Sequence, residues 1–370
     1  MEADMAERAA TAKTVVLAGG GTGGHVYPAL AMGEALQARG HQLRYYGDPG
    51  RLEGRVVPER GIPFHAVPAA QYPRSGVWSK VRFAGSLLSG VVEARRMLRQ
   101  HRADFVLGVG GYISAPPVLA AWTLGIPRAV HEANVTPGLA NRLCARVANL
   151  VLLTYEATGP KLPGSALREV VGCPVNPKVR TGDRAAALER YGLSGDRPIL
   201  LVVGGSLGAQ TINDLGIALA KAEARAFDII LVTGPRYHEA TSAALDPLPG
   251  GVALVDYERR MMDAYAVADL VLCRAGSSTL AELTAVGLGS LLVPSPNVTD
   301  NHQEGNARGL EAVGAARVLV ERGLDAAAAV ADIASLMADP AALAAMGAAA
   351  SGQAKLDTAE RVADLIEARL

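Results

Sequence analysis

The sequence predicts an α/β protein made of two Rossmann-like, doubly wound domains. Short β-branched and aliphatic runs alternate with longer helical patterns along the 370 residues, which is typical of βαβ units and of parallel sheets covered on both faces. The same opening occurs twice, because residues 15–18 and 200–203 each run into a glycine-rich loop and then a helical pattern. The chain is also longer than the ~250 residues at which single cores usually stop growing.

In chain order, we expect six strands in the first half, at residues 14–18, 42–46, 64–67, 105–108, 129–132 and 150–154. Five more are expected in the second half, at residues 199–203, 228–232, 252–255, 270–273 and 290–293. Pro174 and Pro177 disfavour regular structure between residues 172 and 178, so we place the joint there. The predicted domains are residues 1–172 and 173–352. A last alanine-rich helix, at about residues 353–370, can pack on either domain.

Composition excludes several classes of protein. The 36 basic and 36 acidic residues cancel, so the whole molecule has no electrostatic attraction to nucleic acid. Cys144, Cys173 and Cys273 form no CxxC pair, which favours a reducing cytoplasm over a zinc or redox site. The first thirteen residues contain acids and no apolar core, so they are predicted to be a short disordered lead. No run reaches the ~18 apolar residues of a membrane span, so any membrane contact is expected to be peripheral.

The first glycine-rich loop has the sequence GGGTGGH at residues 19–25. It follows a strand and precedes a helix whose first turn contains Pro28, a favoured position for proline. Free amides and the helix dipole at such a point favour a phosphate or a developing negative charge. The loop also satisfies GxGxxG, and Asp48 after the second strand could bind a ribose. A nicotinamide-dependent dehydrogenase and a plain tight turn therefore remain alternatives at this point.

His25 closes this loop at the start of the helix. The helix dipole penalises a protonated imidazole there, so we expect a lowered pKa and a neutral ring. A neutral imidazole can take the proton of an attacking hydroxyl, which makes His25 a candidate general base. The alternative is a capping histidine that only orders the loop.

A second anion-receptive helix start is predicted at residues 273–282, with the sequence CRAGSSTLAE. Its small hydroxyl residues and free amides suit a diphosphate, and the carboxylate of Glu282, one turn further on, suits the two hydroxyls of a ribose. The alternative needs no ligand, since Thr279 and Glu282 stand at capping-box spacing.

Two polar clusters follow apolar strands. His131, Glu132 and Asn134 end the fifth strand, where polar side chains are expected to project into a cleft between the domains, with a buried salt bridge as the alternative. The residues DNHQ at 300–303 offer donors for sugar hydroxyls. No DxD pair lies beside these segments, so we expect no dedicated metal site and no metal cofactor.

Residues 72–103 combine bases with interleaved apolar residues. The segment has one acid, Glu93, and a net charge of +6 from Arg74, Lys80, Arg82, Arg95, Arg96, Arg99 and Arg102. Its apolar members include Val77, Trp78, Val81, Phe83, Leu87, Leu88 and Val91. Such interleaving suggests a helix or loop that lies on an anionic bilayer, with Trp78, Lys80, Arg82 and Phe83 as contacts. A solvated surface helix is the alternative, and nucleic acid is a poor fit because it has no use for the apolar members.

Taken together, the motifs resemble the MurG family of peptidoglycan N-acetylglucosaminyltransferases. They stand in the family's order and are GGGTGGH at 19–25, GVGGYIS at 108–114, HEAN at 131–134, GGSLGAQ at 204–210, CRAGSSTLAE at 273–282 and DNHQ at 300–303. The resemblance implies GT-B architecture, in which two Rossmann-like domains face a central cleft. It implies inverting transfer of GlcNAc from UDP-GlcNAc to undecaprenyl-pyrophosphoryl-MurNAc-pentapeptide (lipid I), giving lipid II for cell wall biogenesis, and hence for cell shape and division.

The resemblance also assigns roles to residues. It implies His25 or the nearby carboxylate of Glu132 as the catalytic base, and the backbone near Glu258 as the frame for uracil. The implied donor contacts are Thr22, Gly23, Gly24, Asn134, Ser206, Ser277, Ser278, Thr279, Leu280, Ala281, Glu282, His302 and Gln303. The first domain would bind lipid I and the cytoplasmic face of the membrane as a peripheral protein, and a cell-wall synthesis complex is a further potential partner.

The sequence departs from the family pattern at two places. The joint has GCPVN at residues 172–176 where the family often has GNP and a nearby arginine, so a phosphate-binding arginine cannot be carried onto Asn176, and Arg180 is only a substitute candidate. His302 stands where glutamine is common, which leaves the sugar contact open between His302 and Gln303. Alternatives to the transferase are a UDP-GlcNAc 2-epimerase or another GT-B enzyme, the dehydrogenase, and a non-catalytic nucleotide-sugar-binding subunit.

Overall fold

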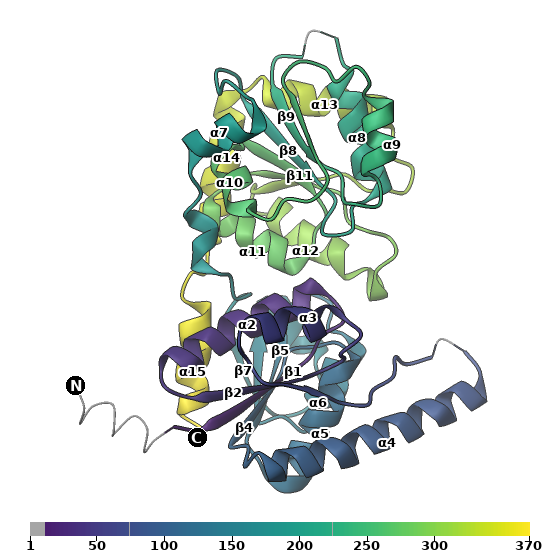
Figure 1. The fold of residues 1–370 in the computed structure, drawn as a ribbon, viewed down its shortest axis with the longest axis vertical. Coiled ribbons are helices and arrows are strands. Elements are labelled where there is room, and N and C mark those ends of the chain that lie inside the picture. Colours follow the sequence, from purple (N-terminus) through teal and green to yellow (C-terminus); the bar gives the residue numbers. More distant parts are fainter. Residues whose placement is uncertain (1–11, 74, 224) are drawn as a thin grey trace, which may run out of the picture. The chain divides into compact units, whose positions relative to one another are not determined.

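The computed structural model describes residues 12–73, 75–223 and 225–370 (Figure 1). Most of the predicted disordered lead and Arg74 of the basic segment lie outside the described residues. The chain forms two compact units, of which unit 1 comprises Met1–Val175 with Lys355–Leu370, and unit 2 comprises Asn176–Ala354. The division at Val175 falls within residues 172–178, and the last helix belongs to unit 1.

Unit 1 is built on a seven-stranded parallel sheet with the order β3-β2-β1-β4-β5-β6-β7. Its strands are β1 (Thr14–Ala18), β2 (Gln42–Gly47), β3 (Phe64–Ala66), β4 (Phe105–Gly108), β5 (Arg128–Glu132), β6 (Leu150–Leu153) and β7 (Leu167–Val170). The order reverses between β1 and β4, and ligands of open α/β sheets bind beyond the carboxyl ends of the strands at such a point. The glycine loop at 19–25 follows β1 directly, so it stands at this switch point.

Helices cover both faces of this sheet. They are α2 (Gly23–Ala38), α3 (Leu52–Glu59), α4 (Val77–Gln100), α5 (Ala115–Leu124), α6 (Leu139–Cys144) and α15 (Thr358–Glu367), with 3-10 turns at Tyr112–Ser114 and Glu156–Lys161. Alternate residues of β1 enter different cores, since Val15 and Leu17 pack with α2 and α15 while Val16 and Ala18 pack with α4 and α5. Burial on both faces explains why β1 reads as an uninterrupted apolar run.

Unit 2 repeats this design with a six-stranded parallel sheet of order β10-β9-β8-β11-β12-β13. Its strands are β8 (Ile199–Val203), β9 (Asp228–Val232), β10 (Val252–Val255), β11 (Leu270–Cys273), β12 (Ser290–Leu292) and β13 (Ala316–Val318). Its helices are α7 (Arg184–Tyr191), α8 (Gln210–Ala220), α9 (His238–Ala244), α10 (Met261–Val267), α11 (Ser277–Val286), α12 (His302–Glu311), α13 (Ala326–Met337) and α14 (Pro340–Ser351), with 3-10 turns at Pro177–Arg180 and Thr299–Asn301. The order reverses between β8 and β11, so the loops after these two strands meet at the switch point of unit 2.

The prediction of two doubly wound parallel sheets is confirmed, including every expected strand. Strands β7 and β13 were not predicted from the sequence. Strand β7 has the sequence LREV and two exposed residues, so it lacks the apolar run of a central strand. Strand β13 spans only Ala316–Val318 at the edge of its sheet and is too short to show a period.

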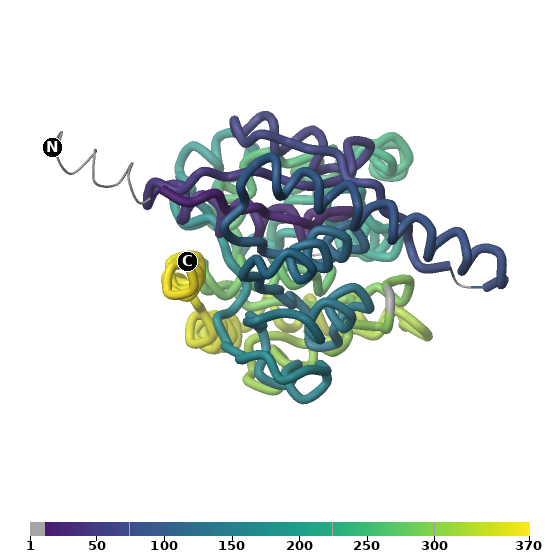
Figure 2. Tube along the Cα trace, turned by 90° about the horizontal axis from the view of Figure 1, so that it is seen from below, coloured from purple at the N-terminus to yellow at the C-terminus, as the bar shows by residue number. Residues whose placement is uncertain are grey.

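Helix α4 projects beyond the sheet of unit 1 (Figure 1), and its N-terminal half also extends away from the rest of unit 1 in the Cα trace of Figure 2. Along the described residues, no single helix has the length and apolarity needed to cross a membrane. In the part of the chain that the structure describes, one pair of helices, α13 and α14, meets that test jointly, and the two are bent by 90° at the break between them.

Candidate functional site

The first glycine loop wraps around a buried carboxylate. Glu53 of α3 is fully buried, and its carboxylate accepts hydrogen bonds from the backbone N–H of Gly21 at 3.0 Å and of Asp48 at 3.3 Å. Gly20 lies so close that a Cβ at this position would overlap the Glu53 carboxylate, and Gly21 has a φ of 87° that favours glycine. Glu53 therefore fixes the conformation of the loop at the end of β1, a role that was not predicted from the sequence.

His25 lies in the first turn of α2, where Thr22 is the N-cap residue. The backbone N–H groups of His25 and Val26 both donate to the carbonyl oxygen of Thr22, at 3.1 and 3.2 Å. The Nδ1 atom of His25 lies 3.1 Å from the carbonyl oxygen of Gly20 and 3.3 Å from Thr22 Oγ1. A carbonyl oxygen can only accept, so the hydrogen-bond geometry assigns the proton of a neutral ring to Nδ1 and leaves the lone pair on Nε2.

The glycine loop after β4, at residues 109–111, leaves room for the imidazole of His25. A Cβ on Gly110 would lie 2.8 Å from Cδ2 and 3.0 Å from Nε2 of His25, and Gly110 has a φ of +94°. The motif GVGGYIS thus brings bare backbone against the ring of His25. Tyr112, from the same motif, donates to Asp48 Oδ2 at 3.2 Å, while Asp48 Oδ1 accepts from the N–H of Gly50 at 2.9 Å. The oxygens of Asp48 are thus engaged within unit 1, which argues against the ribose role of the dehydrogenase alternative.

Glu132 organises the loop that follows β5. It is 2% exposed, and its Oε1 accepts from the backbone N–H of Asn134 at 2.9 Å and from Asn134 Nδ2 at 3.3 Å. Its Oε2 accepts from the N–H of Gly138 at 3.0 Å and from Asn141 Nδ2 at 2.9 Å. Among the described residues these partners are amides rather than cations, so the buried salt bridge considered for this cluster is wrong.

His131, beside Glu132, is almost fully buried at the end of β5. Its Nε2 donates to the carbonyl oxygen of Gly172 at 3.0 Å, while its Nδ1 has no hydrogen-bond partner among the described residues. Burial lowers the pKa of His131, so the ring is neutral and its Nδ1 is an acceptor. Unit 1 thus gathers neutral imidazole and amide groups near its switch point.

In unit 2, helix α11 begins with hydroxyl groups that have no hydrogen-bond partner among the described residues. Gly276 is its N-cap residue and supplies no side-chain cap, and the Oγ atoms of Ser277 and Ser278 are buried without a hydrogen bond to any described residue. Buried hydroxyls normally find partners, so an uncapped helix start with two unsatisfied hydroxyls indicates a ligand position. The N–H of Leu280 donates to Gly276 O at 3.0 Å and its side chain is buried, so Leu280 faces the core.

The capping-box alternative for α11 is wrong. Thr279 lies inside the helix rather than at its N-cap, and Ala281 follows it in the same turn. Glu282 instead accepts a hydrogen bond from the hydroxyl of Tyr265 on α10, with 2.9 Å between Tyr265 Oη and Glu282 Oε2. Burial raises the pKa of the Glu282 carboxyl, and the hydrogen bond from Tyr265 opposes this shift. This hydrogen bond uses Oε2 of Glu282.

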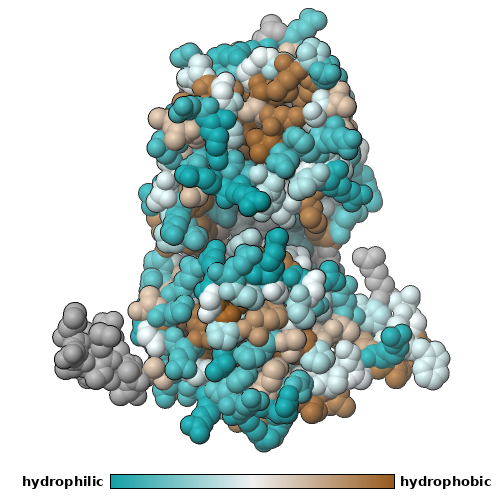
Figure 3. Space-filling model, in the orientation of Figure 1, coloured by the Kyte–Doolittle hydropathy of each residue, from teal (hydrophilic) through white to brown (hydrophobic). Residues whose placement is uncertain are grey.

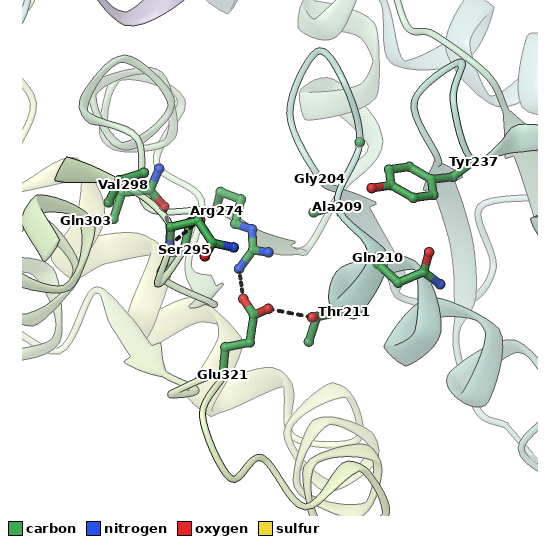
Figure 4. Close-up of a pocket in the computed structure, with 12 residues that line it drawn as sticks. Gly204, Ala209, Gln210, Thr211, Tyr237, Arg274, Ser295, Val298, Gln303 and Glu321 are labelled. Carbon is green, nitrogen blue, oxygen red and sulfur yellow. Dashed lines mark hydrogen bonds and ion pairs between the residues drawn. The ribbon is translucent and has the colours of Figure 1, made fainter. Parts of the chain in front are cut away.

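Unit 2 also has a cavity of about 340 Å³, which Arg274 lines from the loop between β11 and α11, whereas Ser277, Ser278 and Glu282 are not among its lining residues (Figure 4). Its walls come from the loops after β8, β9, β11 and β12 and from the segment after β13, through Gly204, Gly208, Ala209, Gln210, Thr211, Tyr237, Arg274, Ser295, Asn297, Val298, Gln303 and Glu321. Gln303 lines this cavity, whereas His302 is not among its lining residues. Gln303 Oε1 accepts from the N–H of Ser295 at 2.9 Å, which turns its Nε2 into the donor available to a ligand.

Ser206 and Glu258, two further residues with expected donor contacts, also belong to unit 2. Ser206 is exposed in the loop after β8, between cavity residues Gly204 and Gly208. Glu258 is 8% exposed, and its carboxylate accepts from the hydroxyl of Tyr191 and from the N–H of Arg260, each at 2.6 Å. The Glu258 side chain is therefore committed to its own loop and to α7, and only its backbone is left for the nucleobase role expected of it.

The joint residues also have local roles. Asn176 Oδ1 accepts from the N–H of Lys178 at 2.9 Å and caps the turn Pro177–Arg180, while Arg180 is exposed. Across residues 12–73, 75–223 and 225–370, no group of three or more His, Cys, Asp or Glu side chains is arranged to hold a metal ion.

The exposed face of α4 carries large apolar side chains. Trp78 is 82% exposed and Val77 77% exposed, and Lys80 and Arg82 beside them are exposed as well. Phe83 is half-buried against Tyr72, with 5.2 Å between the ring centroids. In the space-filling view, apolar and polar atoms are mixed along this projecting segment (Figure 3). Trp122 of α5, which packs along α4, is also half-exposed, and the sequence analysis missed it.

Comparison with known proteins places both halves of the chain. Residues 15–153 match the glycosyltransferase family 28 N-terminal domain, and residues 199–362 match the family's C-terminal domain. The chain is 39% identical over 359 residues, 95% of its length and 96% of the relative, to the UDP-N-acetylglucosamine–N-acetylmuramyl-(pentapeptide) pyrophosphoryl-undecaprenol N-acetylglucosamine transferase of Acidithiobacillus ferrooxidans. It is 41% identical over 362 residues, 95% of each chain, to the enzyme of the same name from Clavibacter sepedonicus.

A solved structure agrees with these relatives. The crystal structure of Acinetobacter baumannii MurG matches with a TM-score of 0.78 and 31% identity, covering 96% of this chain and 99% of that one. At this coverage the likeness extends through both units.

Proposed function

The chain belongs to the MurG family within glycosyltransferase family 28, and on this premise we propose how its residues carry out sugar transfer. It is a UDP-GlcNAc-dependent N-acetylglucosaminyltransferase of GT-B fold. It moves GlcNAc from UDP-GlcNAc to lipid I and so forms lipid II in peptidoglycan synthesis. This membership replaces the dehydrogenase and the non-catalytic subunit as interpretations of the glycine loops.

The observation that supports the donor site most strongly is the uncapped start of α11. The unsatisfied hydroxyls of Ser277 and Ser278, with the first free N–H groups of the helix and Thr279 beside them, form a receptor for a diphosphate. Glu282, one turn further on, accepts the ribose hydroxyls. Helix start and dipole together stabilise the charge that develops on the departing UDP, and we propose that they do this without a metal cofactor.

Gln303 is the proposed contact to the GlcNAc hydroxyls, because it lines the cavity and its Nε2 is free to donate. Thr22, Gly23, Gly24, Asn134 and Ser206 keep their proposed donor contacts from the family resemblance. The backbone at Glu258 is the proposed frame for uracil, since the side chain of that residue is engaged with Tyr191.

His25 is the proposed general base. In a single inverting displacement, an acceptor hydroxyl oxygen attacks the anomeric carbon, its proton passes to Nε2 of His25, and the bond to the diphosphate breaks with its electron pair leaving on UDP. The hydrogen bond from Nδ1 to Gly20 O supports this role, since it leaves Nε2 unprotonated. Glu132 is better suited to positioning, because four donors already occupy its carboxylate.

Helix α4 is the proposed membrane contact, at the cytoplasmic face of the cell membrane. Trp78 and Val77 are strongly exposed beside the bases Lys80 and Arg82, and Phe83 lies in the second turn of the helix. Exposed aromatic and aliphatic groups flanked by bases favour the headgroup region of an anionic bilayer. A peripheral enzyme placed in this way would reach a lipid-anchored acceptor.

Product analysis tests the proposed function. Purified enzyme incubated with UDP-GlcNAc and a lipid I analogue should release UDP and form a β-linked disaccharide, seen by the anomeric coupling in proton NMR. Release of N-acetylmannosamine without an acceptor would identify an epimerase, and an α-linked product would contradict inversion.

A further inference from the structure

Arg274 and Glu321 form an ion pair at one side of the cavity in unit 2. Arg274 directly follows β11, and its Nη1 donates to Glu321 Oε2 and, at 3.0 Å, to the carbonyl oxygen of Val293. Thr211, in the first turn of α8, donates from Oγ1 to the other carboxylate oxygen of Glu321 at 2.7 Å (Figure 4). All three side chains line the cavity, so the pair is part of its wall.

The geometry leaves one edge of the guanidinium for a ligand. Both hydrogen bonds that Arg274 makes with described residues use Nη1, so the donors on Nε and Nη2 are not used by these contacts. The side chains of Arg274 and Glu321 are 17% and 21% exposed, so solvent and salt screen the attraction between their charges only in part. Burial would raise the pKa of Glu321, but the hydrogen bonds from Arg274 and Thr211 hold it below its usual value, so the carboxylate is ionised.

We propose that Glu321 is a positioning residue that aims the free edge of Arg274 at the diphosphate of the donor. Nη1 of Arg274 donates one hydrogen to Glu321 and the other to the carbonyl oxygen of Val293. Because the guanidinium is planar, fixing this one nitrogen also fixes the direction in which the remaining N–H groups point. This inference rests on the proposed function, because it takes the ligand of the cavity to be a nucleoside diphosphate.

The same carboxylate has a second effect on that ligand. A negative charge in the cavity wall repels a diphosphate, so Glu321 lowers the affinity for UDP while Arg274 meets the charge that develops as UDP departs. Thr211 steadies Glu321 without altering the charge. The two effects predict that loss of the Glu321 charge slows transfer and yet tightens the binding of UDP, which a purely structural residue would not do.

A double-mutant cycle of Glu321→Gln and Arg274→Gln tests this proposal in the full-length enzyme. Single-turnover transfer to a lipid I analogue and the Kd for UDP, from calorimetry, are measured for all four proteins. With Arg274 present, Glu321→Gln should slow transfer about tenfold, as expected for one charge-assisted hydrogen bond, and should bind UDP several-fold more tightly. With Arg274→Gln, Glu321→Gln should cause no further loss of rate.

Thr211→Val is the matched control, since it removes the hydroxyl that steadies Glu321 and keeps every charge. It should slow transfer less than Glu321→Gln does and leave the Kd for UDP unchanged. An equal rate loss from Glu321→Gln on both backgrounds, or UDP binding that is unchanged or weaker, would overturn the positioning role. Failure of the wild-type protein to transfer GlcNAc would instead count against the proposed function itself.

Discussion

The Nδ1 atom of His25 lies 3.1 Å from the carbonyl oxygen of Gly20, and this contact decides which nitrogen of the imidazole can accept a proton. Since the carbonyl requires a donor, Nδ1 carries the hydrogen and Nε2 carries the lone pair. The glycine loop thus has two roles, because its backbone forms the start of α2 and also selects the tautomer of its own histidine.

Replacement of His25 should affect chemistry far more than binding. We expect His25→Ala to lower kcat by about a hundredfold or more, the range of general base catalysis, with little change in the Kd for UDP-GlcNAc. Steady-state rates with a lipid I analogue and calorimetry with the donor measure the two quantities. A kcat equal to that of the wild type would rule out His25 as the base.

Gly110 should be intolerant of a side chain. Gly110→Ala would place a methyl group against Cδ2 and Nε2 of His25 on a backbone with a φ of +94°, so we expect a lower kcat and a lower melting temperature. Gly309→Ala is the matched control, because a Cβ there meets nothing within 4 Å. If the two variants had the same kcat, the close approach of the loop after β4 to His25 would not contribute to catalysis.

Tyr265→Phe should weaken recognition of the ribose. The variant keeps the buried ring and removes the hydroxyl that holds Glu282 Oε2, so we expect a several-fold higher KM for UDP-GlcNAc and a smaller loss in kcat. The preference for UDP-GlcNAc over its 2′-deoxy analogue should shrink as well. An unchanged preference would show that Tyr265 acts on folding alone.

The donor KM should also depend on pH through Glu282. Burial raises the pKa of this carboxyl, so as the pH falls it takes up a proton earlier than an ordinary glutamate and can no longer accept both ribose hydroxyls. The KM for UDP-GlcNAc should therefore rise toward acidic pH. In Tyr265→Phe this rise should begin at higher pH, because the hydroxyl of Tyr265 lowers the pKa of Glu282. A KM profile identical in the two proteins would contradict this coupling.

Membrane association should depend on the exposed residues of α4. The double variant Trp78→Ala, Lys80→Gln should bind anionic phosphatidylglycerol vesicles more weakly in sedimentation assays, since it loses one aromatic contact and one charge. Val313→Ala, at an exposed position of unit 2, is the control for loss of surface apolar area. Equal binding by both variants would leave the membrane contact to some other surface.

The sequence predicted those features that depend on local patterns. Periodicity revealed the central strands, and glycine loops after strands revealed the helix starts at His25 and Ser277. The edge strands β7 and β13 were not predicted, because short or solvent-exposed strands have no apolar run in the sequence. The capping box at Thr279 failed because the helix begins two residues earlier, at Ser277.

Pairings between distant residues were beyond such patterns. Glu53 supports the first loop from 32 residues away, and Glu321 pairs with Arg274 across 47 residues. Nothing in the local sequence of a lone glutamate distinguishes such a partner from a surface residue. The neutral composition likewise gave no hint that one cavity wall contains a paired arginine.

The chain transfers GlcNAc to a lipid-linked acceptor. The most direct test incubates the purified enzyme with UDP-[14C]GlcNAc, with and without lipid I, and counts radiolabel extracted into the organic phase. We expect label in the lipid fraction only when lipid I is present. Donor consumption that is independent of lipid I, or an organic phase without label in its presence, would contradict this expectation.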